Sequence, residues 1–572
     1  MKTIKTDILI LGSGGAGLFA ALHAHQHNPN LSITVAVKGL LGKSGCTRMV
    51  QGGYNVALAK EDSVERHFMD TIEGGKWLPD QDLAWTLVET AVERIHELEN
   101  ELGCFFDRNP DGTIHQKAFA GQTFDRTVHK GDLTGIEIIN RLAEQVWARG
   151  IHRMEEHRAV EFIKNKAGDA VAGVLMIDIR SGEFVFAQAQ AVLLATGGGP
   201  TMYKFHTPSG DKTCDGMAMA LRAGLPLRDM EMVQFHPTGL IAGPDTRITG
   251  TIIEEGLRGA GGYLLNGNKE RFMHKYDPRN ERATRDIVSR GMDQEMREGR
   301  INKSGGLYIT MAHLDPLMVR KQFKGMVERC ADCGFDLVSG LVDVVPTAHY
   351  MMGGVEFKVD CTTPLHGLFC AGEDSGGVHG ANRLGGNGVA NSTVFGGIAG
   401  DVMPGWVKAH GAFSEPDKLA LDEAVARCRA PFAKPAGSLV ALVNIREKLY
   451  NHMWDDVGIV RDAASLARSA GTLDELEAEL DATGVDSRNL AFNLTWHDWL
   501  NLKNLILVSK SIRNAAEARE DSRGAHFRTD FPQVRDLENS RFTSVSWQAG
   551  RFDCVTKPVI FTRVKPGATL IK

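Results

Sequence analysis

The sequence lacks long apolar runs, an excess of basic charge and a regular cysteine pattern, and each absence excludes a class of protein. Its 572 residues contain no uninterrupted apolar run of about eighteen, so no segment is expected to span a membrane. A formal net charge of −6 gives no basic footprint for nucleic acid. The nine cysteines are an odd number without regular spacing, which argues against a disulfide framework and for a reducing compartment. We therefore expect a cytoplasmic protein that binds no nucleic acid.

Metal-ligand patterns are scarce as well. Cys330 and Cys333 form the one CxxC pair, and a Cys₄ site needs a second pair that the sequence does not contain. We interpret the two cysteines as thiols near a helix end, and we predict no metal site in this chain.

Glycine, in contrast, is abundant, with 63 residues gathered mainly in four clusters. The first cluster follows the apolar run DILIL at 7–11 and opens a predicted helix over about 15–27, which gives a G-x-G-x-x-G motif its expected context. Gly12 permits the tight turn, Gly14 lets the backbone approach a pyrophosphate, and Gly17 lets helix and strand pack closely. The start of the helix then faces the negative charge. These features predict a dinucleotide site.

The acidic residue that an NAD site carries about 20 residues further on is missing. The second predicted strand, SITVAV at 32–37, is followed by Lys38. This favours FAD, with the ribose held by other groups.

The chain is too long for one hydrophobic core, so we expect about two to four domains. We predict an α/β fold, with a Rossmann-like FAD-binding domain, an inserted α+β capping domain and a helical C-terminal domain. The predicted limits are 1–235 and 350–405 for the discontinuous FAD-binding domain, 236–349 for the capping (substrate) domain, 415–525 for the helical domain and 526–572 for an irregular tail.

Five further motifs share one family resemblance. They are ATGGG (195–199), QFHPTG (234–239), PTAHYMMGG (346–354), HGANRLGGN (379–387) and SRGAHFRTDFP (522–532). With the glycine turn, they resemble the succinate dehydrogenase/fumarate reductase flavoprotein family, which also includes L-aspartate oxidase and the adenylylsulfate reductase flavoprotein. The resemblance extends from residue 1 to about 532.

The resemblance implies hydride transfer between flavin N5 and a carbon of a dicarboxylate, with an arginine that moves the matching proton. It assigns that role to Arg285, with Glu255 and Arg258 as a relay, because arginine with a pKa above about 12 is a poor acid alone. Arginine also fits carboxylates through its planar fork. The implied substrate contacts are His236, His349, Arg383, Phe119, Gly121, Gln122 and Glu254. The implied FAD contacts are Gly12, Gly14, Gly15, Gly17, Lys38, Ser44, Cys46, Thr47, Gln51, Gly52, Gly53, Ala195, Thr196, Gly197, Asp215, Glu373, Arg383, Gly388 and Val389.

Each residue alone has a plainer interpretation. A single arginine usually lies on a solvated face, and Arg258 could pair with Glu255 on the surface because residues three apart on a helix meet. The occurrence of five motifs in one order favours the functional interpretation.

Cys46 stands where several family members carry a histidine bonded to the flavin. A cysteine could form a thioether, since neighbouring Lys43 and Arg48 would lower its pKa. Alternatively, Cys46 is a small buried thiol with no bond to the flavin. We expect the second arrangement, with FAD held non-covalently.

Glu254 is the larger departure, because the family has a threonine there that helps to hold a substrate carboxylate. A carboxylate beside Glu255 would repel a dianionic substrate. Two carboxylates that close together also raise the pKa of one of them. Glu254 is therefore protonated, or turns to a cation such as Arg258, or serves a substrate other than plain succinate. Ala120 and Gly388 are milder departures, from glycine and serine respectively.

Three functions are compatible with these features. The first is a fumarate reductase/succinate dehydrogenase-type flavoprotein, peripheral on the inner face of the cell membrane, with a membrane anchor and a separate iron–sulfur subunit. The second is a stand-alone oxidase of the L-aspartate type, or an oxidoreductase for a modified polycarboxylate. The third is an electron-relay protein without dicarboxylate turnover, against which the intact His236, Arg285, His349 and Arg383 argue.

Overall fold

A seven-stranded, mostly parallel sheet forms the centre of the molecule. The computed structural model describes residues 1–571 except 244, 245, 247 and 436–438. The main strand order is β6-β2-β1-β9-β8-β7, and β16 pairs with β9. The sheet therefore joins stretches that are far apart in the chain. Its strands are β1 (Lys2–Leu11), β2 (Ile33–Val37), β6 (His152–Glu155), β7 (His157–Lys164), β8 (Val171–Asp178), β9 (Phe184–Leu194) and β16 (Leu368–Cys370).

Alternation along β1 divides the core into two layers. Ile8 and Ile10 belong to one buried cluster, and Leu9 and Leu11 belong to another, because successive side chains of a strand point to opposite faces. The first cluster includes the helices α1 and α10, and the second includes the C-terminal helices. The helices of the first layer are α1 (Gly15–His27), α2 (Val64–Gly74), α3 (Gln81–Asn100), α4 (Thr134–Ala148) and α10 (Asn387–His410).

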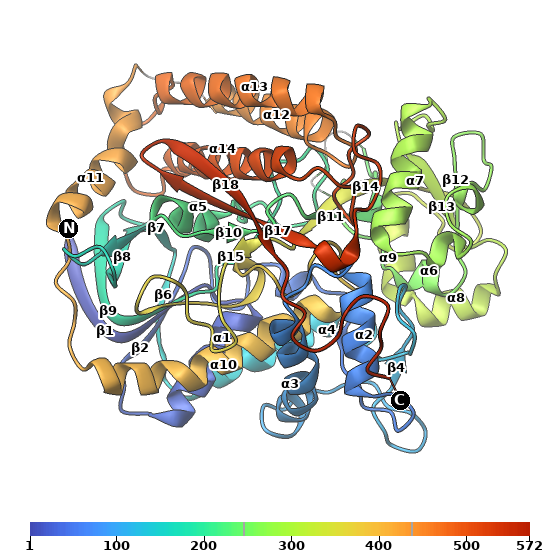
Figure 1. Cartoon of the computed structure of the whole chain (residues 1–572), viewed down its shortest axis with the longest axis horizontal. Helices are drawn as coiled ribbons and strands as arrows, with labels where there is room; N and C mark the ends of the chain where they lie inside the picture. The colour runs from blue at the N-terminus through green and yellow to red at the C-terminus, as the bar shows by residue number, and fades with distance from the viewer. Residues whose placement is uncertain (244–245, 247, 436–438, 572) are drawn as a thin grey trace.

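The capping region has a hydrophobic core of its own, which contains Leu240, Leu257, Val288 and Met326. It lies at one end of the molecule, on the right in Figure 1. The predicted limits at 235 and 349 fall inside two paired strands, β11 and β14, that run from the cap towards the FAD-binding part. The elements are β11 (Val233–Leu240), α6 (Gly256–Gly259), β12 (Tyr263–Leu265), α7 (Arg285–Arg297), β13 (Leu307–Thr310), α8 (Pro316–Gln322), α9 (Lys324–Asp332) and β14 (Val342–Met351).

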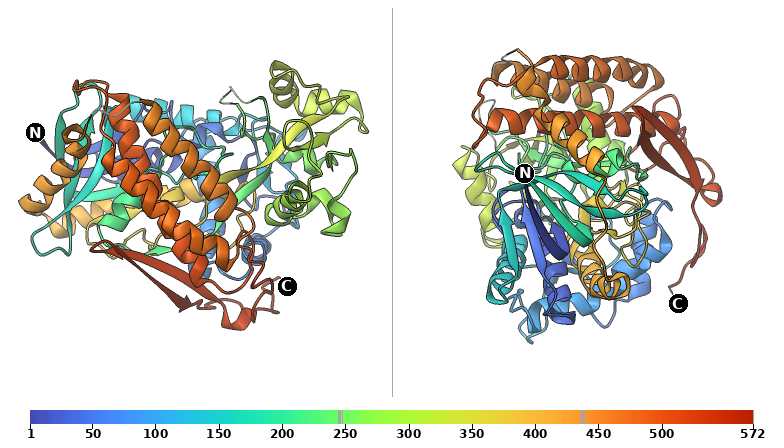
Figure 2. Two further views of the ribbon diagram at one scale, coloured as in Figure 1. Left: turned by 90° about the horizontal axis from the view of Figure 1, so that it is seen from above. Right: turned by 90° about the vertical axis from the view of Figure 1, so that its left-hand side faces the viewer.

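Long helices close the fold on the other face of the main sheet, and α12 to α14 lie side by side in Figures 1 and 2. Among the described residues, no helix is both long and apolar enough to cross a bilayer. The helices of this layer are α5 (Asp215–Arg222), α11 (Lys418–Arg429), α12 (Leu439–Asp456), α13 (Ala463–Ala482) and α14 (Leu494–Ala518).

The prediction of an irregular tail needs correction. β17 (Arg541–Gln548) and β18 (Arg551–Pro558) form an antiparallel hairpin, which joins β10 (Leu227–Arg228) and β15 (Gly354–Val355) in a four-stranded sheet. The two turn residues, Ala549 and Gly550, have φ angles of 48° and 81°, which suits a tight hairpin turn. The Ala-Gly pair between two alternating stretches is the sequence signal that the prediction missed.

A small sheet, β3-β5-β4, follows directly on Gly52 and Gly53, which line the cavity described below. It consists of β3 (Tyr54–Asn55), β4 (Gln116–Lys117) and β5 (Thr127–Val128). The CxxC cysteines lie where α9 ends, as predicted, with Cys330 in its last turn and Cys333 at its C-cap.

Candidate active site

The turn between β1 and α1 can hold a phosphate-bearing group. Gly12 has a φ of +107°, and a Cβ there would lie 2.1 Å from the carbonyl oxygen of Ala195. A Cβ on Gly17 would lie 2.0 Å from the carbonyl oxygen of Gly12. The backbone N–H of Gly15 donates to Thr47 Oγ1 at 3.0 Å. The buried Ser13 Oγ has no hydrogen-bond partner among the described residues, which leaves it available to a bound pyrophosphate.

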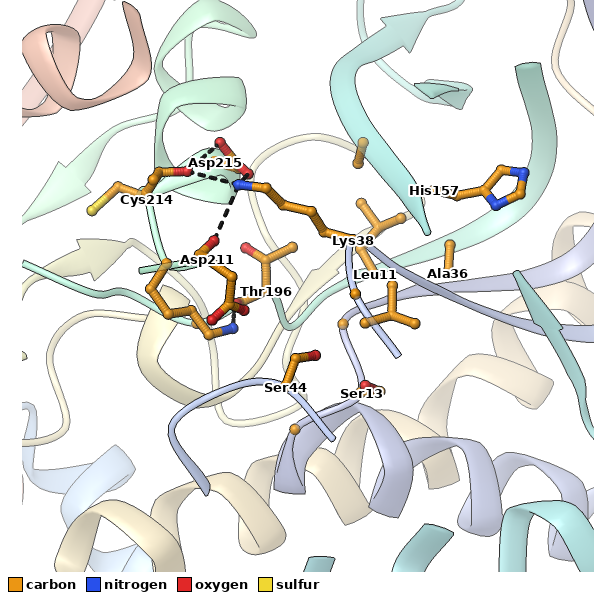
Figure 3. Close-up of a pocket in the computed structure, with 18 residues that line it drawn as sticks. Leu11, Ser13, Ala36, Lys38, Ser44, His157, Thr196, Asp211, Cys214 and Asp215 are labelled. Atoms are coloured by element: carbon orange, nitrogen blue, oxygen red, sulfur yellow. Dashed lines mark hydrogen bonds and ion pairs between the residues drawn. The ribbon is translucent and has the colours of Figure 1, made fainter. Parts of the chain in front are cut away.

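A small pocket next to this turn contains Lys38, Ser44 and Asp215 (Figure 3). The Lys38 ammonium donates to Asp215 Oδ2 at 3.0 Å, Asn501 Oδ1 at 2.9 Å and Thr213 Oγ1 at 3.1 Å. Since lysine has three donors, these acceptors occupy it fully. Lys38 therefore fixes the carboxylate of Asp215 at the wall of this pocket, and its contact with FAD stays a prediction.

The charges of this pocket are coupled. Burial lowers the pKa of Lys38 to about 8, although the charge of Asp215 opposes the shift. Burial acts to raise the pKa of Asp215, but Arg158 and Lys38 outweigh it and hold that pKa below its ordinary value. Asp215 is thus an ionised acceptor at the pocket wall, suited to the hydroxyls of a ribose.

A cavity of about 790 Å³ extends from the glycine turn to the capping region. Most of the predicted site residues line it. The predicted FAD contacts in its wall are Gly14, Gly15, Cys46, Thr47, Gln51, Gly52, Gly53, Ala195, Thr196, Gly197, Glu373, Gly388 and Val389. The predicted substrate and catalytic residues in its wall are Phe119, His236, Glu254, Glu255, Arg285, His349 and Arg383.

Four predicted residues line neither pocket: Gly17, Gly121, Gln122 and Arg258. Gly17 serves the packing of helix on strand, as above. The Gln122 amide donates to the carbonyl oxygen of Gly385 at 3.0 Å, so it braces the loop that precedes α10. In this structure, only Phe119 of the predicted loop at 119–122 reaches the cavity.

Arg285, Glu255 and Arg258 form one buried chain. Arg285 Nη2 lies 2.6 Å from Glu255 Oε2, and Arg258 Nη2 lies 2.9 Å from Glu255 Oε1. Arg285 begins α7 and faces the cavity, whereas Arg258 is fully buried behind it. The surface interpretation of the Arg258–Glu255 pair is therefore wrong.

The two arginines on either side of Glu255 keep it ionised. Burial alone would raise the pKa of Glu255, but Arg285 and Arg258 outweigh burial and lower it. Burial lowers the pKa of Arg258, with partial compensation by Glu255. A carboxylate held between two guanidiniums, one of them at the cavity wall, can pass a proton to the cavity side.

Both predicted histidines are neutral donors. Burial, followed by the positive charge of Arg285, places the pKa of His236 and that of His349 well below the ordinary value. The backbone N–H of Thr238 donates to His236 Nδ1 at 3.2 Å, so the ring proton of His236 lies on Nε2. His349 Nδ1 lies 2.8 Å from Thr207 Oγ1.

Arg383 has an unsatisfied donor. Its guanidinium packs 4.4 Å from the ring centre of Tyr350, and its buried Nε has no partner among the described residues. Burial, reinforced by repulsion from Arg285, lowers its pKa to about 10. A buried cation with a free donor in a cavity is suited to a carboxylate ligand, because an unmade hydrogen bond there is costly.

Glu254 turns away from Arg258. Its Oε1 lies 2.5 Å from Lys117 Nζ, on β4, and its side chain is 3% exposed. Burial raises the pKa of Glu254, and the charge of Lys117 opposes that shift. Of the three sequence-based alternatives, pairing with a cation is the one that the geometry supports, although the partner differs from the one expected.

Cys46 is not activated by its neighbours in sequence. Lys43 is exposed, and Arg48 Nη1 donates to the carbonyl oxygen of Gly42 at 3.3 Å. Burial, and then the charge of Glu373, raises the pKa of the Cys46 thiol to about 12. The predicted lowering by Lys43 and Arg48 is therefore wrong, since desolvation of the thiolate dominates.

Sequence reasoning missed several residues of this site. Gln234 Oε1 accepts from Arg285 Nη1 at 3.0 Å, and its Nε2 donates to the carbonyl oxygen of Arg383 at 2.7 Å. Its position two residues before His236 in one strand was an available signal, because i and i+2 share a face. Nothing local in the sequence pointed to Lys117 or to Thr207.

Comparisons with known proteins identify relatives of this chain. Residues 7–389 match the FAD binding domain family, and residues 446–570 match the fumarate reductase flavoprotein C-terminal family. The chain is 40% identical over 539 residues to a fumarate reductase (CoM/CoB) subunit of Methanothermobacter marburgensis, a match that covers 93% of this chain and 95% of the relative. It is 34% identical to the 8-methylmenaquinol:fumarate reductase flavoprotein subunit of Wolinella succinogenes, with 98% and 91% covered.

A solved structure is similar throughout. FrdA of Escherichia coli quinol fumarate reductase, in a single-residue variant, superposes with a TM-score of 0.92 at 32% identity, and 99% of each chain is covered. Adenylylsulfate reductase from Archaeoglobus fulgidus superposes with a TM-score of 0.80 at 18% identity, a likeness of fold alone.

Proposed function

This chain belongs to the fumarate reductase/succinate dehydrogenase flavoprotein family, and from this premise we propose that it interconverts a C4-dicarboxylate pair of the fumarate and succinate type. It is an FAD-dependent oxidoreductase of that family. One observation carries the substrate proposal. The buried cluster of Arg258, Arg285 and Arg383 contains one ionised carboxylate, Glu255, so its net charge complements a dianion.

FAD supplies the hydride chemistry when it is bound. His236 Nε2 and the Arg383 guanidinium would hold the substrate carboxylates, with His349 as a further donor, and these contacts fix the substrate carbons relative to Arg285. Arg285 would give a proton to the substrate carbon during reduction, or take it during oxidation. Glu255 would restore the charge state of Arg285, and Arg258 would connect Glu255 to the interior of the cap.

An anaerobic titration tests the proposal. We expect the oxidised-flavin absorbance of the chemically reduced holoprotein to return rapidly on addition of fumarate. Succinate should bleach the oxidised flavin more slowly if the flavin potential is low. If neither compound alters the spectrum while FAD remains bound, the chain does not act on this dicarboxylate pair.

We propose that the electron partner is a separate iron–sulfur protein, because the cysteines of this chain show no cluster pattern. By analogy with the family, a membrane anchor would hold the complex on the inner face of the cell membrane. A stand-alone oxidase of the L-aspartate type remains the second candidate, since Glu254 could receive an amino group. Oxygen consumption by the isolated chain with aspartate would favour that candidate.

We also propose that FAD is held without a covalent bond to Cys46. A neutral thiol with a pKa of about 12 is a poor nucleophile, and the thiolate is the bond-forming species. After denaturing electrophoresis, we expect no ultraviolet fluorescence at the position of the chain, and we expect the flavin in the acid supernatant. A fluorescent band that disappears in a Cys46→Ser variant would show a thioether instead.

A further inference from the structure

Lys117 occupies a position that no motif of the sequence indicated, directly behind the wall of the substrate cavity. We infer that Lys117 is a positioning residue for substrate binding: it neutralises Glu254, so that the cavity admits a doubly charged dicarboxylate despite the carboxylate in its wall. This inference rests on the proposed function and deepens it, because it explains how the site tolerates the departure at Glu254.

Lys117 is held in place by its backbone. It pairs with Thr127 in the small sheet, and the amide of the preceding Gln116 donates to the carbonyl oxygens of Val56 at 2.7 Å and Arg126 at 2.9 Å. Lys117 Nζ also donates to the carbonyl oxygen of Gly131 at 3.3 Å. The ammonium therefore faces Glu254 from a fixed strand, and it does not itself line the cavity.

Glu254 faces the cavity, in contrast, with one carboxylate oxygen unengaged. Its Oε1 meets Lys117, and no partner is found for Oε2 among the described residues. Glu254 lines the same cavity as Arg285, His236 and Arg383. A dianion bound to those groups would lie near an ionised Glu254, and like charges in a desolvated site repel strongly.

The charges around Glu254 show why Lys117 is the decisive one. Glu254 interacts with Lys117, with Asp132 before α4 and with Glu255 at the start of α6. Asp132 and Glu255 are both acidic and oppose ionisation of Glu254. Lys117 is the one cation of this set, so its removal would leave Glu254 without compensation.

The pH dependence follows from this arrangement. Without Lys117, Glu254 would be protonated at low pH and would become an unpaired anion as the pH rises. Repulsion of a dianionic substrate would then appear only on the alkaline side. In the wild type, the ionised Glu254 remains paired, so this rise in KM should be absent.

The test is a double-mutant cycle in the FAD-loaded protein, with KM for fumarate and kcat measured across pH. We expect Lys117→Gln to raise KM roughly thirtyfold at the alkaline end of the range, where Glu254 is ionised, with a smaller change in kcat and little change in KM at low pH, because an unpaired buried charge is costly. Lys117→Arg keeps the charge and should remain close to wild type. In the double variant Lys117→Gln/Glu254→Gln, KM should return to within about threefold of wild type.

Lys130→Gln is the matched control. Lys130 lies close by in the chain and makes a half-exposed ion pair with Asp107 at 3.4 Å. The Lys130→Gln variant should have the wild-type KM for fumarate. The inference is wrong if Lys117→Gln leaves KM unchanged, or if adding Glu254→Gln to that variant does not restore KM. Either result leaves fumarate reduction by the wild type unaffected. If the wild type does not reduce fumarate in any buffer, the proposed function fails first.

Discussion

Arg285→Gln should abolish fumarate reduction and leave FAD bound. The reason is that Arg285 is the member of the Arg285–Glu255–Arg258 chain that faces the cavity. Glutamine can still donate a hydrogen bond, but it cannot carry the proton. Loss of a general acid costs about 10²–10⁴ in rate, and we expect the upper part of that range because the proton has no second route in the proposed mechanism.

The measurement is stopped-flow reoxidation of the chemically reduced holoprotein by fumarate, with the flavin content determined on the same sample. Arg282→Gln is the matched control, since Arg282 is exposed three residues earlier and should leave the rate unchanged. A rate for Arg285→Gln within about tenfold of wild type, with full flavin content, would remove Arg285 from the proton-transfer role.

Gly12→Ala should yield protein without flavin. The new Cβ would lie 2.1 Å from the carbonyl oxygen of Ala195, and the φ of +107° disfavours any side chain. β1 and β9 cannot easily move apart at this point, because the Ala195 N–H, just after β9, donates to the carbonyl oxygen of Leu11 in β1 at 3.0 Å. The turn must therefore change shape, and with it the surface that we expect to meet the pyrophosphate.

Flavin per chain from the absorbance spectrum, together with the melting temperature, checks this result. Gly168→Ala is the control, because Gly168 has a φ of +78° but a Cβ added there would meet no heavy atom within 4 Å. The control should lose about 1 kcal/mol from backbone strain and keep its flavin. A Gly12→Ala protein with normal flavin content would show that the turn can relax.

The sequence predicted the local parts of the FAD site well. The helix expected at 15–27 is α1, Gly15–His27, because the glycine turn and the apolar strand before it both constrain the backbone locally. The fold class and the family, inferred from six motifs, are confirmed by the matches over residues 7–389 and 446–570. The sequence misled where a side chain depends on its surroundings, as for Cys46, whose pKa is raised by burial.

The backbone turns, the family and the set of charged residues can be read from the amino-acid sequence alone. Glycine turns and motif spacing are local properties, and they are legible without the fold. Which charged side chains lie together depends on the tertiary fold. Glu254 pairs with Lys117, which lies 137 positions away in the sequence, and Gln234 accepts a hydrogen bond from Arg285, 51 positions away. Such pairs depend on how strands and loops from separate stretches converge, and in a buried cavity the partner of each charge determines its ionisation.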